Sequence, residues 1–203
     1  MIFVQYVLTD TNKRCRPLEH FTHYLQQGYY PFGAEGFATY NQRVENTVEL
    51  LLNIELPQLR KVDIGNIRKL KALLSVLASE VPILVDTAKL STLLGISRNT
   101  LLAYLEYLDE AKLIRRLYSD DLSVKKMQKP DKILMDNCNL LKVLALKEPN
   151  IGTLRETFFC NQLGYQHQVE YSKQGDFLID HHITFEIGGQ AKEGKQVAAI
   201  ENC

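Results

Sequence analysis

The segment DTAKLSTLLGISRNTLLAYLEYLDEA, from Asp86 to Ala111, restricts the fold more than any other part of this sequence. Asp86 and Ser97 each precede a leucine-rich run with helical spacing, and both are residue types that cap helix N-termini. Gly95 ends the first run, since glycine readily takes the left-handed conformation found at helix ends. Two capped helices joined by a Gly-Ile-Ser turn predict a helix-turn-helix.

Two strands are expected after this pair of helices. Residues 113–118 and 132–135 are mainly apolar runs, and the polar segment SDDLSVKKMQKP joins them. A helix-turn-helix followed by such strands predicts a winged helix over residues 81–136. Six apolar residues are spaced to close its core: Leu90, Leu93, Ile96, Leu101, Leu105 and Leu108.

A winged helix of this kind is suited to contact DNA. In DNA-binding proteins the second helix presents its N-terminal residues to base edges, and basic residues elsewhere contact phosphates. We expect such a contact to rest mostly on the wing and to be independent of DNA sequence. The candidate nucleic-acid-binding residues are Arg98, Asn99, Thr100, Lys125, Lys126 and Lys129.

The charge distribution leaves a second role open for this module. The second helix carries Arg98 against three acids, whereas residues 112–132 carry seven bases against three acids. A net acidic helix is a poor reader of base sequence, so a transcription regulator is disfavoured. Protein docking or a rigid spacer role therefore stands beside DNA contact. The acids of the second helix are Glu106, Asp109 and Glu110.

Residues 1–80 carry helical patterns. Apolar residues recur with helical spacing in 17–27, 40–52 and 65–78, and the aromatic loop GYYPFG follows the first of these segments. His20 and His23 share a helix face without a nearby ligand cluster, so structural roles are expected for both. The third helix has a basic face, for which a solvated surface is the default and a phosphate contact is the alternative: Arg68, Lys69 and Lys71.

Residues 137–203 predict a small α/β unit. A helix is expected over 151–163, strands over 169–171, 176–179 and 183–187, and a second helix over 192–201. This order is typical of a restriction-endonuclease-like core, although the usual final strand is missing. His181 and His182 are expected in the turn between the last two strands.

Three acids of this unit are candidate catalytic residues: Glu156 on the helix, and Asp176 and Glu186 on consecutive strands. The two strand carboxylates are candidate ligands for Mg²⁺, an ion that prefers oxygen ligands and activates bound water. Gly188 stands where sites of this type usually carry a lysine, so a residue such as Lys192 or Lys195 would have to supply the cation. The alternative is an inactive scaffold in which these acids pair with neighbours or form turns.

The segment 189–195 matches GxxxxGK, follows an apolar strand and precedes an expected helix. A P-loop needs Ser or Thr next to hold magnesium, but the next residue is Gln196. Only eight residues follow Lys195, which leaves no room for the partner strands of a nucleotide-binding domain. ATP hydrolysis is therefore not expected, and no cofactor is required apart from the Mg²⁺ of the nuclease alternative.

Composition narrows the functional class. The 203 residues have a formal net charge of zero, so any contact with nucleic acid must come from a local patch. The four cysteines, Cys15, Cys138, Cys160 and Cys203, form no CxxC pair, which favours reduced thiols in the cytoplasm over a zinc cluster or a disulfide framework. No signal peptide is recognisable, and no apolar run reaches the roughly 18 residues of a transmembrane helix. A soluble cytoplasmic chain without a membrane partner is expected.

Several longer segments resemble a known family. GYYPFG, LVDTAKLSTLLGISRNTLLAYLEYLDEA, KPDKILMDNCNL, NIGTLRETFF, DFLID and TFEIGG are together similar to a bacterial group of AAA-type ATPases. In that group a P-loop domain is followed by a helical lid, a winged helix and a C-terminal domain of unknown function that is regarded as nuclease-like. The resemblance covers almost the whole chain. The nucleotide-binding core and its Walker motifs have no counterpart here, so a fragment shortened at both ends is expected.

The resemblance implies an α+β multidomain chain. Its parts are a helical lid remnant over 1–80, the winged helix over 81–136 and a truncated restriction-nuclease-like α/β domain over 137–203. The implied function is an accessory region that couples the motor core to a DNA or protein partner, with ATP bound only by the absent core. Glu156, Asp176 and Glu186 match the acid positions of the nuclease-like core. A Mg²⁺- or Mn²⁺-dependent nuclease using Asp176 and Glu186 is the alternative function.

Overall fold

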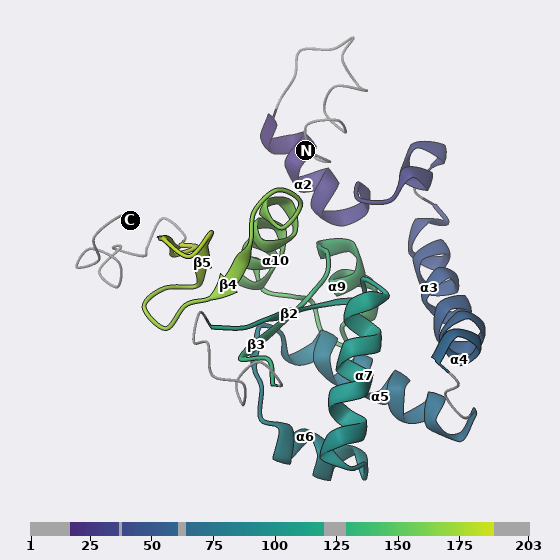
Figure 1. Ribbon diagram of the computed structural model, residues 1–203. Coiled ribbons are helices and arrows are strands. Elements are labelled where there is room, and N and C mark those ends of the chain that lie inside the picture. Colours follow the sequence, from purple (N-terminus) through teal and green to yellow (C-terminus); the bar gives the residue numbers. More distant parts are fainter. Residues whose placement is uncertain (1–16, 37, 61–63, 120–128, 189–203) are drawn as a thin grey trace.

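The computed structural model describes residues 17–36, 38–60, 64–119 and 129–188 of the chain (Figure 1). It is an α+β fold in which helices pack around two small antiparallel sheets. The helices are α2 (Pro17–Gln27), the 3₁₀ helix η1 (Pro31–Glu35), α3 (Tyr40–Leu50), the π-helix η2 (Leu51–Glu55), α4 (Leu56–Arg60), α5 (Ile64–Glu80), α6 (Thr87–Leu94), α7 (Arg98–Glu110), α9 (Cys138–Leu144) and α10 (Ile151–Leu163). The strands are β1 (Ile83–Leu84), β2 (Ile114–Leu117), β3 (Lys132–Met135), β4 (Val169–Tyr171), β5 (Phe177–Ile179) and β6 (Ile183–Phe185).

Most of the expected elements are present. Helices α2 and α10 and strands β3 and β4 have the predicted bounds, and α5, β2, β5 and β6 differ from their predicted bounds by one or two residues at an end. The expected helix over 192–201 lies outside the described residues. None of the described helices is both long enough and apolar enough to cross a bilayer.

The helix predicted over 40–52 is longer than expected. It continues from α3 through the π turn η2 into α4 and ends at Arg60. The π turn ends two residues before Pro57, which has no N–H and whose ring would clash with the carbonyl four residues earlier in a regular α-helix. Because a π turn widens the helix, the chain passes this proline without breaking.

The helix pair α6–α7 has the capping that the sequence predicts. The Asp86 carboxylate accepts hydrogen bonds from the backbone N–H groups of Ala88 and Lys89, and Ser97 Oγ accepts from Thr100 N. Gly95 adopts a left-handed conformation with φ of 59°, which ends α6. The two helices lie between β1 and β2 in sequence, and the three strands form an antiparallel sheet in the order β1–β3–β2.

The predicted core of this helix pair was wrong at Leu93. Leu90, Leu101, Leu105 and Leu108 are buried, but Leu93 is 62% exposed. Helix α6 has only two turns, so a single narrow stripe faces the core. Leu94, which is one helical turn from Leu90, occupies that stripe in place of Leu93.

Helix α9 lies at the centre of the molecule and was not predicted. It contacts α2, α3, α5 and α10, and its residues from Cys138 to Leu141 are all buried. One hydrophobic cluster extends from Tyr24 to Leu154 around this helix. The regions expected over 1–80, 81–136 and 137–203 therefore contribute side chains to a shared core.

The second sheet has the strand order β4–β5–β6 and lies beyond α10, on the side of the molecule opposite the α3–α4 rod (Figure 1). Its apolar face packs on α10, with the rings of Phe159 and Phe177 stacked at 5.4 Å between centroids. A backbone hydrogen bond of 2.9 Å from Tyr171 N to Tyr118 O joins β4 to the end of β2. Asp180 and His181 both have positive φ angles in the β5–β6 turn, which confirms the turn predicted at His181 and His182.

Candidate functional site

The N-terminus of α7 presents the residues that the sequence assigned to nucleic-acid contact. Arg98 and Asn99 are exposed, and the first turn of the helix contains no acid. Thr100 is half-buried, and its hydroxyl lies 2.8 Å from the Ser97 hydroxyl within the cap. The Lys69 ammonium of α5 donates to the Gly95 carbonyl at 2.9 Å and so fixes the turn that precedes α7. Arg98 and Asn99 are therefore displayed from a well-anchored helix end.

The acids of α7 lie toward the other end of the helix, and two of them are paired with arginines. Asp109 accepts a hydrogen bond from Arg116 Nε at 3.1 Å, and Glu110 forms an ion pair with Arg60. Eleven residues separate Arg98 from Asp109, which corresponds to about 16 Å along the helix axis. The acids that give α7 its net negative charge therefore lie at a distance from its N-terminus, and ion pairs neutralise two of them.

The expected basic wing is only partly described. Lys125 and Lys126 lie outside the described residues, whereas Lys129 is half-buried. Lys129 lies close enough to Asp86 to contribute, after the backbone N–H groups of Lys89 and Ala88, to the lowered pKa of that carboxyl. Lys129 is therefore near the N-terminus of α6.

Three of the seven bases counted between residues 112 and 132 belong to internal ion pairs. Arg116 binds Asp109, and the Arg115 guanidinium lies 3.0 Å from the Asp136 carboxylate. The third, Lys132, is buried against an acid of α10. These three cations are engaged in ion pairs within the fold. The segment therefore has fewer basic side chains available for phosphate contacts than its net charge suggests.

Asp176 and Glu186 lie at the open end of the β5–β6 hairpin. The ladder ends with the pair Phe177 and Phe185, and the two acids come directly beyond it in the chain. The Asp176 N–H donates to the Phe185 carbonyl at 2.8 Å, so Asp176 lies against Phe185 and the regular pairing does not continue to Glu186. Asp176 Oδ2 accepts a hydrogen bond of 2.6 Å from Ile187 N, so this carboxylate also closes the end of the hairpin.

Glu156 is not part of this pair. Its carboxylate lies 2.6 Å from the Lys132 ammonium, which in turn lies 4.8 Å from the centroid of the Phe177 ring. Asp176 lies in the bend before β5, where its carboxylate accepts from Ile187 N, so Glu156 and Asp176 have different partners. Among the described residues, no group of three or more His, Cys, Asp or Glu side chains is arranged to hold a metal ion.

The position expected to carry a lysine is Gly188, which is exposed at the end of the described segment. Lys192, Lys195 and Gln196 lie outside the described residues. The two carboxylates supply hard oxygen donors of the kind that Mg²⁺ prefers, although one oxygen of Asp176 is already engaged.

A buried polar network around the GYYPFG loop was missed in the sequence. Asn139 accepts from Tyr29 N at 2.8 Å and from Tyr40 Oη at 2.5 Å, and donates to the carbonyls of Tyr24 and Leu25. All four hydrogen-bonding positions of this amide are therefore used inside the protein. Two asparagines within four residues after a buried strand, in DNCNL, were the available signal for it.

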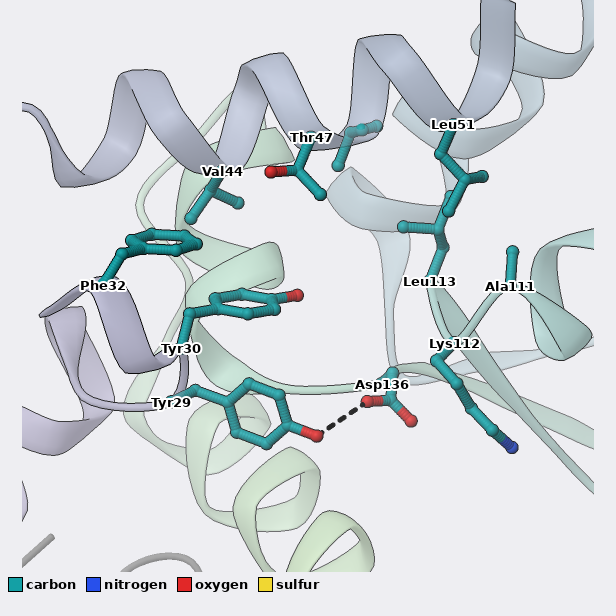
Figure 2. Close-up of a pocket in the computed structure, with 11 residues that line it drawn as sticks. Tyr29, Tyr30, Phe32, Val44, Thr47, Leu51, Ala111, Lys112, Leu113 and Asp136 are labelled. Atoms are coloured by element: carbon teal, nitrogen blue, oxygen red, sulfur yellow. Dashed lines mark hydrogen bonds between the residues drawn. The ribbon is translucent and has the colours of Figure 1, made fainter. Parts of the chain in front are cut away.

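A second part of this network centres on Asp136. Its carboxylate binds Arg115, and the Tyr29 hydroxyl donates to it at 3.4 Å (Figure 2). Burial raises the pKa of Asp136, and the neighbouring Arg115 opposes that shift. Burial likewise raises the pKa of Tyr30 to about 12. These groups join the loop after α2 to the β3–α9 corner.

The two described cysteines carry no reactive thiolate. Cys138 and Cys160 are free and buried. Burial raises the pKa of each thiol to about 12, so both remain protonated at neutral pH.

Comparison with known families assigns most of this fold to one group. A family model described as a domain of unknown function, DUF8612, matches residues 18–150. The chain belongs to this family. The DUF8612 match begins within α2 and ends at Asn150, the N-cap of α10, so it includes α7 and excludes the β4–β6 sheet. No curated protein and no solved structure matches the chain.

Proposed function

We propose that this DUF8612 chain is an interaction region that contacts duplex DNA through a winged-helix module, as an accessory part of a AAA-type ATPase. The module comprises residues 81–136, with α7 as the helix that approaches DNA and the β2–β3 connection, most of which lies outside the described residues, as the wing. The chain itself would neither bind nor hydrolyse ATP. The free, buried thiols of Cys138 and Cys160 are compatible with a cytoplasmic location.

The observation that carries this proposal is the exposed, acid-free N-terminus of α7. Arg98 and Asn99 stand at the end of a helix that is capped, tied to α5 through Lys69 and preceded by a tight turn. In helix-turn-helix proteins this end of the second helix contacts base edges. The positive end of the helix dipole adds to the attraction for phosphates.

The strand order supports the same assignment. A sheet with the order β1–β3–β2, with two helices inserted between β1 and β2, is the arrangement expected of a winged helix. Lys129, three residues before β3, lies close enough to Asp86 for its charge to act on that carboxyl. Because Arg115, Arg116 and Lys132 are occupied internally, the described part of the module offers few phosphate contacts. We therefore expect weak affinity that falls as salt rises.

An electrophoretic shift assay with a labelled duplex at low salt tests this proposal. Arg98→Glu is expected to weaken binding at least about tenfold, because it replaces a cation at the contact by a repelled anion. Lys173→Glu is the matched control: it makes the same charge change at an exposed position between β4 and β5 and should weaken binding less than about twofold. No shift of duplex at low salt, or equal losses in the two variants, would reject the DNA contact and leave a protein partner as the role of the module.

A nuclease remains the second candidate because Asp176 and Glu186 lie at the same open end of the β5–β6 hairpin. The two carboxylates would bind Mg²⁺ or Mn²⁺, which supplies activation of water when bound. Asp176 would combine that role with its hydrogen bond to Ile187 N. Incubation of plasmid with the protein and Mn²⁺ should produce nicks that vanish in Glu186→Gln. Cleavage that persists in this variant, or no cleavage in the unmodified chain, would eliminate the candidate.

A further inference from the structure

A cavity of about 270 Å³ opens between α3, the loop after α2 and the turn from α7 into β2. In Figure 2, Tyr29, Tyr30 and Phe32 form one side, α3 forms a second side, and the turn into β2 closes the far end. The surface of the cavity is largely apolar, because the aromatic rings and the aliphatic side chains of α3 dominate it. Helix α3 contributes Val44, Thr47 and Val48.

The polar groups around the cavity are already used within the protein. The Asp136 carboxylate binds Arg115 and receives the Tyr29 hydroxyl, and the Tyr30 hydroxyl accepts from Asn137 Nδ2 at 3.2 Å. The Thr47 hydroxyl donates to the carbonyl of the preceding turn at 2.8 Å. Binding sites for polar metabolites normally present a few convergent polar groups. This cavity presents an apolar surface instead, so it suits a hydrophobic group.

Lys112 is the cation at the edge of this cavity. It is exposed, and its ammonium forms no ion pair with a carboxylate of the described residues. Burial raises the pKa of Asp136, and the charge of Lys112, after that of Arg115, weakly opposes this rise. Its side chain extends away from the cavity in Figure 2, so an anion bound to it would lie outside the apolar space. A ligand whose hydrophobic group fills the cavity would therefore carry its acidic group at a neighbouring position, outside the cavity, and not on the hydrophobic group itself.

The size of the cavity limits what enters. A cavity of about 150 Å³ in another protein holds benzene, so 270 Å³ accommodates one phenyl or isobutyl group together with its Cβ. Outside the cavity on α3, Leu50 is 50% exposed and lies one helical turn from Thr47. One buried anchor with further contacts on a helix surface is the usual geometry of a peptide-binding site.

We propose that this cavity binds a protein partner through one phenylalanine or leucine side chain that is followed by acidic residues, which pair with Lys112. The hydrophobic side chain enters between Tyr30 and α3. The acidic residues remain at the surface beside the end of α7. This site is separate from the N-terminus of α7, so it stands independently of the proposed DNA contact.

NMR titration of the ¹⁵N-labelled full chain tests the proposal with defined peptides. The probe Ac-Ser-Gly-Phe-Glu-Glu-Gly-Ser-NH₂ is expected to shift the amide signals of Tyr30, Thr47 and Ala111 saturably. Replacement of its Phe by Ala should abolish these shifts, and replacement of its two Glu by Lys should weaken binding at least about fivefold. Lys112→Glu should reverse the preference between the acidic and basic peptides, whereas Lys147→Glu, an exposed control, should leave it unchanged.

A blocking variant separates the cavity from general surface binding. Thr47→Trp places a large ring at the cavity from an exposed position and should abolish binding, whereas Asn46→Trp on the same helix should not. Equal binding of the Ala and Phe peptides, shifts that survive Thr47→Trp, or no saturable shifts would overturn the proposal. Tighter binding of 3-phenylpropanoate than of the acidic peptide would also overturn it, because the cavity would then serve a small amphipathic acid.

Discussion

Replacing Glu156 by alanine is expected to lower the free energy of unfolding by about 3 kcal/mol. The Glu156 carboxylate lies 2.6 Å from the Lys132 ammonium, and the two side chains are only 15% and 9% exposed. Without the acid, the buried ammonium keeps the Phe177 ring as its neighbour but loses its counter-charge. Loss of one member of a buried pair costs about 3–5 kcal/mol, and the residual exposure of this pair places it at the lower end.

The double variant Lys132→Met, Glu156→Leu removes both charges while it keeps similar side-chain volumes. Its stability should lie within about 1 kcal/mol of the unmodified chain, because the attraction between two buried charges roughly offsets their desolvation. Urea unfolding followed by far-UV circular dichroism measures both variants, and an unchanged m-value shows that stability alone has changed.

The surface pair Lys142–Glu148 is the matched control for this experiment. Its charged atoms are 3.0 Å apart, but the Glu148 side chain is 80% exposed. Glu148→Ala should therefore cost less than about 0.5 kcal/mol. A cost below about 1 kcal/mol for Glu156→Ala, or a double variant as unstable as the single one, would refute the structural role of Glu156.

Three further predictions follow from buried or capping groups. Asn139→Asp should cost more than about 3 kcal/mol in urea unfolding, since the carboxylate would face two backbone carbonyls that now receive N–H donors; a loss below about 1 kcal/mol would contradict the network. Cys138 and Cys160, whose thiol pKa values burial raises to about 12, should resist iodoacetamide at pH 8 until urea unfolds the chain, as peptide mass spectrometry would show. The pKa of Asp86 is lowered by the backbone N–H of Lys89, so its stabilising effect should be present above the unfolded pKa of about 3.9 and be lost as pH falls through the lower folded value. Asp86→Asn should reduce the fall of the urea midpoint with decreasing pH. An unchanged fall would contradict the stabilising role of the Asp86 carboxylate.

Local signals account for the parts of the fold that were predicted. Asp86 and Ser97 stand directly before leucine-rich runs, and capping depends on neighbouring backbone atoms, so the sequence alone places α6 and α7. The same holds for α10, where Asn150 caps the helix through the N–H of Thr153. Asp176 and Glu186 lie at the same end of the β5–β6 hairpin because short strands flank a turn that was also recognised.

Features that depend on distant residues could not be predicted in this way. Helix α9 has seven residues and is buried on several sides, so it lacks the apolar stripe that reveals surface helices. Lys132 and Glu156 are 24 positions apart in the sequence and form a buried ion pair. Glu156, a predicted catalytic acid, therefore has a partner that local sequence patterns do not reveal. The pairing of Asp109 with Arg116 similarly neutralises one of the acids that give α7 its net negative charge in the sequence.

The salt dependence of duplex binding tests the role of the α7 N-terminus most directly. Fluorescence anisotropy of a labelled duplex, measured from about 50 to about 200 mM salt, gives the slope of log Kobs against log salt concentration. If Arg98 contacts a phosphate, Arg98→Ala should make this slope less steep by about one unit, while Lys173→Ala should leave it unchanged. Identical slopes for Arg98→Ala and the unmodified chain, at equal or unequal affinity, would contradict a phosphate contact at this helix end.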